Sequence, residues 1–331
     1  MTSKKLLPRI KRTITAAMIA TSFSTLALAQ AYPSKPIRVV TEFGPGSGGD
    51  IILRVMTTVM AEQMGQSFVV ENRAGAGGVV AAEAVVRSAP DGYTLGVYSP
   101  NALVTRRVLA KGGSPIDVLK DLTPITALGD AVMLIFVQPN GPIKTLRELV
   151  DYAKANPGKL SYGSSGFGSI HHLAQEQVAM IAGADMLHIP YKTGTDAVAA
   201  LVSGQIPVTY AILGSIGPHL RAGKVVPIAR VGTKRLESMP QVPALTEVAP
   251  GFEPPPGWEG MFAPAGLPQS ILRRLNAEAV KALTLAQSKA KIGELGFDVI
   301  ANTPEEFTAL IKSQIDLVAR IAKTAKIQPI E

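Results

Sequence analysis

The pattern of apolar and polar positions predicts strands that alternate with helices between residues 37 and 98. Three apolar, β-rich segments are separated by Gly- or Pro-rich turns, and apolar residues recur at helical spacing between them. The predicted strands span 37–43, 67–70 and 93–98, and the predicted helices span 50–64 and 79–88. This alternation is typical of a parallel sheet with helices on both of its faces.

The same alternation returns in the middle of the chain and predicts a second α/β unit. Its predicted strands span 131–137, 160–163, 186–189, 208–213 and 225–231, and its predicted helices span 145–155, 169–181 and 196–203. A Pro-rich segment at 240–257 is predicted to cross between the units. Two helices at about 268–288 and 304–324 have no strands of their own, so we expect them to pack on the first unit.

These patterns predict an α/β fold with two lobes, two crossing segments that join them, and a cleft between them. The first lobe is expected to be discontinuous and to comprise residues 30–130 and 252–331. The second lobe is expected to span residues 131–251. A chain of 331 residues has room for two such domains.

Residues 1–29 are predicted to be a secretory signal peptide. Five Lys and Arg residues precede an uncharged stretch from residue 14 to residue 28, and Ala27-Leu28-Ala29 fits a small-x-small cleavage pattern. A membrane anchor is the alternative, but a spanning helix needs about 20 predominantly apolar residues, and Ser and Thr interrupt this shorter stretch. We expect cleavage after Ala29 or Ala31 and a periplasmic location.

Composition and charge exclude several classes of function. The chain contains no Cys, which excludes a disulfide framework, a Cys nucleophile and thiolate metal sites. The formal net charge is +8, but without the five basic residues of the predicted signal peptide 28 basic residues face 25 acidic ones. No later run of Lys or Arg exceeds a pair, and we therefore expect no nucleic-acid partner.

A glycine-rich motif follows the first predicted strand and resembles a dinucleotide fingerprint. Gly44, Gly46 and Gly49 form a GxGxxG pattern, and Glu71 lies 22 residues beyond Gly49. Asp50 follows the turn directly, and its carboxylate would repel a pyrophosphate; an exported chain would also meet little nicotinamide cofactor. No cofactor is therefore expected, although free amides at a helix start can bind another small anion, such as a carboxylate.

A second glycine- and serine-rich loop, at residues 164–169, makes the same kind of site in the second lobe. Its alternative interpretation is a flexible turn with Ser169 as a capping residue. Both loops follow the carboxyl end of a predicted strand, where ligands bind in open α/β sheets. Together they predict an anion held from both sides of the cleft.

Several other candidate functional residues are better explained by a structural role. His171, His172 and Glu176 have a spacing that a metal would tolerate, but no third ligand has recognisable spacing, so no metal is expected. A hydrolase that uses Ser169 and His171 would lack a GxSxG elbow. His188 is expected in the core. Trp258 is placed in the crossing segment, where it could face the cleft or brace the hinge.

The chain resembles the periplasmic substrate-binding proteins of tripartite tricarboxylate transporters, the Bug family. The resemblance rests on segments in the family's order and spacing: 32–38, 44–50, 70–78, 90–95, 162–169, 188–192, 240–243 and 262–266. It implies a type II periplasmic-binding-protein-like fold that closes about a hinge on a small organic carboxylate. It also implies delivery of this ligand to integral-membrane transporter subunits, and no catalysis. We expect a monomer.

The resemblance also implies a ligand shell from both lobes. The first lobe would contribute Phe43, Pro45, Ser47, Gly48, Gly49, Asp50 and Ser99. The second lobe would contribute Ser164, Ser165, Gly168, Ser169, Thr193 and Thr195. In the family, much of this contact comes from backbone amides, hydroxyl groups and bridging waters.

Some positions depart from the family pattern. Glu42 stands where Pro is usual, Thr193 replaces a usual Gly, and Pro207 replaces a common Asp. Tyr210-Ala211 stands where an Asp-Asn pair is common, so an acid that could receive an ammonium group is missing there. We therefore predict a carboxylate with a neutral body as the ligand. A sensor subunit for a signalling partner, an exported enzyme and a dinucleotide-binding protein are the alternatives.

Overall fold

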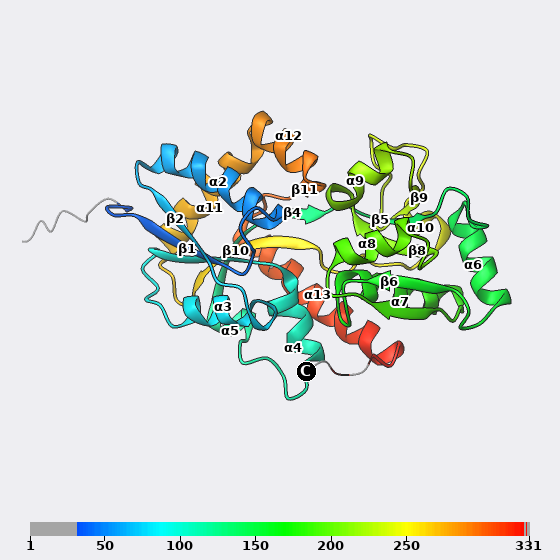
Figure 1. Cartoon of the computed structure of the whole chain (residues 1–331). Helices are drawn as coiled ribbons and strands as arrows, with labels where there is room; N and C mark the ends of the chain where they lie inside the picture. The colour runs from blue at the N-terminus through cyan, green and yellow to red at the C-terminus, as the bar shows by residue number, and fades with distance from the viewer. Residues whose placement is uncertain (1–31, 328, 330–331) are drawn as a thin grey trace, which may run out of the picture. The chain divides into compact units, whose positions relative to one another are not determined.

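Two β-sheets organise the protein, and each combines strands from distant parts of the sequence (Figure 1). A computed structural model describes residues 32–327 and 329. The six-stranded sheet has the order β11-β4-β10-β3-β1-β2, with β1 (Ile37–Thr41), β2 (Phe68–Asn72), β3 (Thr94–Tyr98), β4 (Leu122–Ala131), β10 (Trp258–Pro264) and β11 (Phe297–Val299). The five-stranded sheet has the order β7-β6-β8-β5-β9, with β5 (Met133–Val137), β6 (Ser161–Ser164), β7 (Leu187–Pro190), β8 (Val208–Ile212) and β9 (Val226–Arg230).

Both sheets are mixed, which corrects the expectation of parallel sheets. Strands β1, β2 and β3 pair in parallel, as do β6, β7 and β8. Strand β10 runs antiparallel to β3 and β4, β11 runs antiparallel to β4, and β5 runs antiparallel to β8 and β9. Strands β4 and β5 carry the chain from the first sheet to the second, and β9 and β10 carry it back, so antiparallel pairs occur at the crossings.

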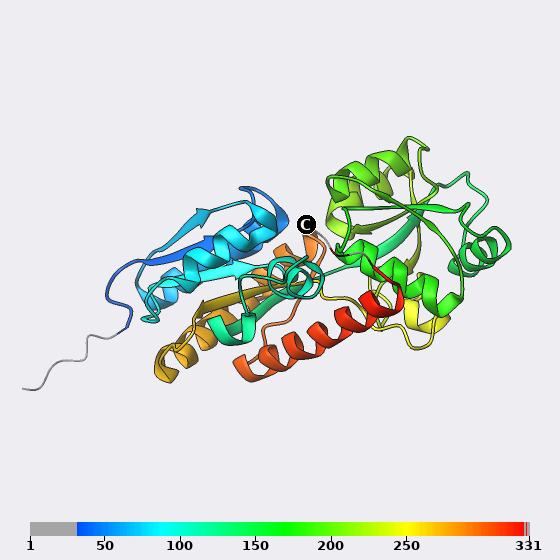
Figure 2. The same cartoon turned by 90° about the horizontal axis from the view of Figure 1, so that it is seen from below.

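Helices cover both faces of each sheet (Figures 1 and 2). On the six-stranded sheet, α2 (Gly48–Met64), α11 (Gln269–Thr284) and α12 (Ala286–Glu294) pack together, and the other face carries α3 (Val79–Val86), α4 (Arg106–Leu109), α5 (Val118–Asp121) and α13 (Pro304–Thr324). The five-stranded sheet lies between α6 (Leu146–Ala155), α7 (Ile170–Ala182) and α10 (Leu245–Val248) on one face and α8 (Gly194–Val202) and α9 (Leu213–Arg221) on the other. Two short turns complete the list, η1 (Ala76–Gly78) and the π-helical η2 (Asn101–Thr105).

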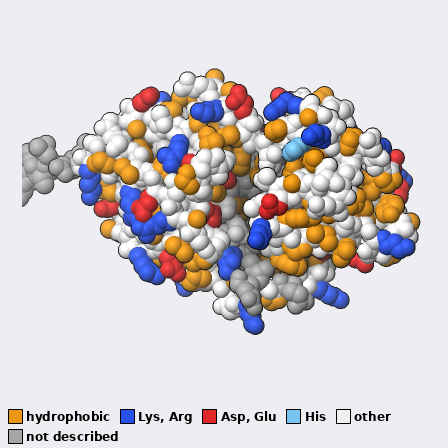
Figure 3. Space-filling model, viewed as in Figure 1, with side chains coloured by type: hydrophobic (Ala, Val, Ile, Leu, Met, Phe, Trp, Pro, Cys, Tyr) orange, Lys and Arg blue, Asp and Glu red, His pale blue; other side chains and the backbone are white. Residues whose placement is uncertain are grey.

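Alternating apolar side chains explain the two cores of each sheet. In β5, Ile135 joins the cluster under α6 and α7, whereas Leu134 and Phe136 join the cluster under α8 and α9. This period of two is what a strand buried on both faces requires. We call the six-stranded sheet with its helices the first half and the five-stranded sheet with its helices the second half; a furrow separates them in Figure 3.

The C-terminal helices return to the first half, as predicted, but the segment predicted at 268–288 is two helices. Leu285 has extended backbone angles and separates α11 from α12. Helix α13 packs on β4 and also on α7 of the second half. Phe307 of α13 and Leu173 of α7 share one core cluster with Trp258.

Three strands, β4, β10 and β11, were not expected from the sequence. Pro124 and Gly129 interrupt the pattern of β4, and β10 follows directly on the Pro-rich segment. Trp258 is consequently the first residue of a strand rather than part of the crossing segment. The chain passes from the first sheet to the second between Ala131 and Met133 and returns between β9 and β10.

The predicted signal peptide lies outside the described residues. Among residues 32–327 and 329, no helix combines the length and apolar character that a membrane span requires.

Candidate functional site

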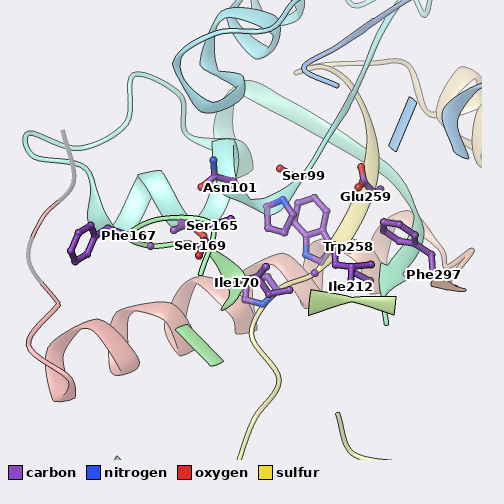
Figure 4. Close-up of a pocket in the computed structure, with 16 residues that line it drawn as sticks. Ser99, Asn101, Ser165, Phe167, Ser169, Ile170, Ile212, Trp258, Glu259 and Phe297 are labelled. Atoms are coloured by element: carbon purple, nitrogen blue, oxygen red, sulfur yellow. The ribbon is translucent and has the colours of Figure 1, made fainter. Parts of the chain in front are cut away.

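A cavity of about 300 Å³ lies where the two halves meet (Figure 4). This volume is at the lower end of the range for small-molecule sites. The first half contributes Ser99, Pro100, Asn101, Thr105, Ala131, Trp258, Glu259 and Phe297 to its lining. The second half and the crossing segment contribute Ser165, Phe167, Gly168, Ser169, Ile170, Ile212, Pro256 and Gly257.

The loop between β6 and α7 forms the second-half wall as the sequence indicated. Ser169 is the N-cap of α7, and its hydroxyl accepts a hydrogen bond from the amide of His172 at 3.3 Å. The first amides of a helix have no partner within the helix, so the start of α7 offers donors towards the cavity. Of the predicted ligand shell in this half, Ser165, Gly168 and Ser169 line the cavity.

The other predicted residues of this half lie elsewhere. Ser164 is fully buried, and its hydroxyl lies 2.6 Å from His188 Nε2. Thr193 and Thr195 are exposed at the start of α8, where the Thr193 hydroxyl caps the helix by accepting from the Asp196 amide at 3.1 Å. None of these three residues lines the cavity, and the hydroxyl groups of Ser164 and Thr193 hold local structure instead.

The glycine-rich loop before α2 does not line this cavity, and residues 44–47 of it are exposed. Asp50 is buried, and its carboxylate accepts hydrogen bonds from the Gly46 amide at 2.9 Å and from Arg54 at 2.9 Å. Burial opposes ionisation, but the Arg54 side chain and the Gly46 amide outweigh it and lower the pKa of Asp50. Ser47 is the N-cap of α2. None of the predicted loop residues is in the cavity lining, namely Phe43, Pro45, Ser47, Gly48, Gly49 and Asp50.

Side chains from β10 and β11 that line the cavity also lie against the start of α2. A Cβ atom at Gly49 would lie 2.8 Å from Glu259 Oε2, and one at Gly48 would lie 3.3 Å from the Phe297 ring. A dinucleotide pyrophosphate at this helix start would therefore meet a carboxylate. This contact adds a structural reason to reject the dinucleotide interpretation of the GxGxxG pattern.

Ser99 lines the cavity, but an internal acid occupies its donors. Its amide donates to Glu42 Oε1 at 2.6 Å, and its hydroxyl donates to the same oxygen at 2.8 Å. Burial raises the pKa of Glu42 to about 7, although both Ser99 hydrogen bonds favour the ionised form. Glu42, which departs from the family pattern, thus takes the place of a ligand at Ser99.

Glu259 is the one acidic residue among the described residues that line the cavity, and sequence reasoning missed it. Its side chain is buried, and Oε2 has no hydrogen-bond partner in the described part of the chain. Burial raises the pKa of Glu259 well above its usual range, and the charge on Glu42 raises it further. An acid inside the apolar run from Trp258 to Pro264 was the signal that could have revealed it.

Trp258 both faces the cavity and braces the first half. Its indole lies between Ser165 and Ser169 on one side and Glu259 and Phe297 on the other in the view of Figure 4. The indole nitrogen donates to Gln314 Oε1 on α13 at 2.5 Å. The ring also packs edge-on against Phe307, with centroids 5.0 Å apart.

The histidines near the cavity are neutral at neutral pH. Burial lowers the pKa of both His171 and His188 to about 4. Burial also lowers the pKa of His172, and the nearby His188 adds to this effect, so that the pKa is about 3. His172 and His188 stack with centroids 4.2 Å apart. No set of three His, Cys, Asp or Glu side chains among the described residues could hold a metal.

Ser165, and not Ser169, pairs with a histidine in the cavity wall. Its hydroxyl lies 2.8 Å from His171 Nδ1. A serine nucleophile of the triad type needs a third group that orients the histidine. Within the described residues no carboxylate bonds to His171, so the pair lacks that group.

Comparison with known proteins identifies the family. The profile described as "Tripartite tricarboxylate transporter family receptor" matches residues 52–327. The chain belongs to this family. BugT of Bordetella pertussis is 32% identical over 299 residues, which cover 89% of this chain and 90% of BugT. A UPF0065 protein of a Pseudomonas species is 33% identical over 303 residues, which cover 91% of this chain and 89% of that protein.

Solved structures share the fold. The periplasmic binding protein BugD has a TM-score of 0.74 and 28% identity, with 90% of this chain and 99% of BugD covered. A protein of R. palustris solved with adipate has a TM-score of 0.78 and 29% identity over 90% of this chain and all of that chain. MatC from Rhodopseudomonas palustris with bound malate has a TM-score of 0.72 and 29% identity, with 88% and 99% covered. The predicted Bug-type periplasmic-binding-protein fold and family resemblance are confirmed, and this family consists of solute-binding receptors.

Proposed function

We propose that this chain is an exported solute-binding protein that captures a small organic carboxylate and delivers it to a tripartite tricarboxylate-type membrane transporter. The observation that carries the proposal is a cavity whose walls come from both sheets. Neighbours with the same fold were solved with adipate and malate, which are small carboxylates. Capture involves no chemical step in this proposal.

The start of α7 is the element that we propose holds the carboxylate. The amides of its first turn, which have no partner within the helix, and the Ser169 hydroxyl are donors, and a helix N-terminus favours negative charge. The Ser165 hydroxyl could also bind the ligand if it turns away from His171. Hydrogen bonds to a charged group contribute about 1.5–3 kcal/mol each, and micromolar affinity corresponds to about 8 kcal/mol, so a few such bonds suffice once binding costs are met.

The proposed movement is closure of two lobes about the crossings at Ala131–Met133 and Pro254–Gly257. The lobes would be residues 30–130 with 252–331, and residues 131–251. Closure would bring Trp258 and Glu259 towards the α7 loop and expel water. We propose a monomer that reaches the periplasm through cleavage of residues 1–29, and a membrane partner that recognises the closed form.

Intrinsic fluorescence tests this proposal, because Trp258 is the one tryptophan of the chain and lines the cavity. We expect a saturable change on titration with at least one member of a panel of aliphatic, hydroxy and aromatic carboxylates, with micromolar affinity. Calorimetry would show binding heat without turnover and no response to NAD. A panel without any saturable response would contradict the proposal.

Ser169→Leu is the matching loss-of-binding variant, because a bulky side chain at this position fills the α7 end of the cavity. We expect affinity to fall at least 100-fold while circular dichroism keeps the wild-type signal. Thr193→Leu is the control, since Thr193 also caps a helix in the second half but is exposed outside the cavity. Equal affinity in both variants would show that the ligand binds elsewhere.

A further inference from the structure

The cavity wall formed by β10 presents an acid that the protein leaves without a partner. Glu259 is 7% exposed, and its Oε2 is enclosed without a hydrogen bond from any described residue. No Lys or Arg belongs to the described lining of the cavity. A buried polar group without a partner costs free energy, and a buried charge costs more.

A purely structural role does not account for Glu259. Its Oε2 lies near Gly49 at the start of α2, where a capping carboxylate would accept an amide hydrogen bond, but none reaches it. Ser47 already caps that helix. The Gln314 side chain binds the neighbouring Trp258 indole. Glu259 thus belongs to the cavity wall, and no described hydrogen bond holds its Oε2 to an element of the fold.

Glu42 adds negative charge to the same side of the site. Its carboxylate is held by the Ser99 amide and hydroxyl, and Ser99 belongs to the cavity lining. Glu42 also lies against the start of α3, because a Cβ atom at Gly78 would overlap its Oε2. This wall is therefore acidic, in contrast to the donor-rich start of α7.

The two walls lie on opposite sides of Trp258. Figure 4 places Ser165 and Ser169 to one side of the indole and Glu259 to the other. A ligand that spans the cavity would meet hydrogen-bond donors at one end, an apolar surface in the middle and a carboxylate at the other end. This order is complementary to a molecule with an anionic group, an apolar body and a cationic group.

We propose that the ligand carries a protonated nitrogen at the end opposite its carboxylate and that Glu259 binds this nitrogen. This inference rests on the proposed function and narrows its ligand class to small ω-amino carboxylates and their close analogues. The sequence led us to expect a carboxylate with a neutral body, because Ala211 stands where an acid could receive an ammonium group. The present inference reverses that expectation. The acid that receives the nitrogen comes from β10 instead of β8.

Ligands with matched carbon chains provide the test. Three chain lengths are titrated by Trp258 fluorescence at pH 7.5: butanoate, pentanoate and hexanoate, their ω-amino derivatives, and the dicarboxylates succinate, glutarate and adipate. At one chain length or more, we expect the ω-amino acid to bind at least tenfold more tightly than the dicarboxylate with the same number of carbons and than every monocarboxylate of the panel. In Glu259→Gln we expect this preference to fall below threefold while the monocarboxylate keeps its affinity.

The control variant is Glu83→Gln. Glu83 lies on the surface of α3 in an ion pair with Arg87 at 2.6 Å, and its substitution should leave all affinities unchanged. A dicarboxylate that binds best at every length would show that Glu259 acts as a neutral donor, and would overturn the inference. Survival of the amino preference in Glu259→Gln would overturn it as well.

The outcomes also separate this inference from the proposed function. If none of these nine compounds binds but another carboxylate of the wider panel does, the inference fails and the proposed function stands. If no carboxylate of either panel binds, both fail.

Discussion

Two glutamates give this cavity its chemistry at the level of single residues. Glu42 directly follows β1 and Glu259 lies in β10, and both have a pKa raised by burial. Stability does not explain these acids, because burying an ionisable group costs free energy unless it is well paired. Their placement beside a cavity is therefore best explained by a role towards what the cavity holds.

Glu42 should make stability depend on pH in a definite direction. Burial raises its pKa from 4.5 to about 7, so between these values the folded protein keeps a proton that the unfolded chain has released. Stability from this group is present below pH 4.5 and is lost as the pH rises towards 7. We expect the free energy of unfolding of wild type minus that of Glu42→Gln to fall by about 1–3 kcal/mol over this window and to stay constant above it.

Urea denaturation at several pH values measures this difference. The comparison with Glu42→Gln is needed because His171, His172 and His188 act in the opposite direction: burial lowers the pKa of each, so protonation of the unfolded chain costs stability as the pH falls below 6.5. Their effect is common to both proteins and cancels. A difference that stays flat from pH 4.5 to 7 would show that Glu42 is not desolvated in the folded protein.

The sequence indicated the donors of the site better than its acids. Ser165, Gly168 and Ser169 follow a predicted strand and open a predicted helix, so local rules place them at the cavity. Glu259 reaches the cavity because β10 inserts between β3 and β4, 160 residues away from Ser99 in sequence. Such a long-range pairing leaves no local pattern. An acid within an apolar run was visible in the sequence, but its place at the cavity could be recognised only after the sheet order was known.

Helix caps connect the loops of this fold to its binding site at the level of elements. Ser169 caps α7 beside the cavity. Thr145 caps α6 with a full capping box, in which the Glu148 side chain accepts a hydrogen bond from the Thr145 amide. Alanine at an N-cap costs about 0.5–2 kcal/mol. We expect Ser169→Ala and Thr145→Ala to lose comparable stability, but only Ser169→Ala to weaken carboxylate binding, by about five- to tenfold.

Thermal unfolding and fluorescence titration of both variants check this expectation. The pair separates capping from ligand contact, because Thr145 belongs to a helix that does not line the cavity. Unchanged affinity in Ser169→Ala would indicate that the amides alone hold the ligand. Reduced affinity in Thr145→Ala would show that any loss of stability in the second half weakens binding.

The sequence predicted the helices and strands that have caps, turns or apolar periodicity of their own. It did not predict strands that depend on pairing with a distant part of the chain. The helix at 304–324 has a capping box from Thr303 and Glu306 and a Pro at its start, and the structure confirms it as α13. Strand β11 has three residues and owes its existence to pairing with β4. Leu285 breaks the predicted helix at 268–288 because its backbone is extended, which no apolar spacing reveals.

At the scale of the whole molecule, the two halves touch at a close backbone contact beside the crossings. Gly214 at the start of α9 lies against Leu295, and a Cβ atom there would overlap the Leu295 carbonyl oxygen. The Val132 amide of the first crossing donates to the Gly296 carbonyl at 2.8 Å. Arg230 of β9 and Asp298 of β11 form an ion pair at 2.5 Å in the same region.

Gly214→Ala should therefore disturb this junction. We expect a loss of about 1–3 kcal/mol in the free energy of unfolding, because backbone on both sides must shift to admit the methyl group. Gly293→Ala in α12 is the control: a Cβ atom there has no heavy atom within 4 Å, and Ala favours a helix. Equal stability of the two variants would mean that the junction is looser than the structure shows.

The proposed function requires a small organic acid bound between the two halves. Mass spectrometry of the molecules released on denaturing the protein, purified from its native host, tests this most directly. We predict one organic acid in near-equal molar amount with wild type and at least tenfold less with Ser169→Leu. Release of no acid from wild type, or of equal amounts from both proteins, would contradict the account.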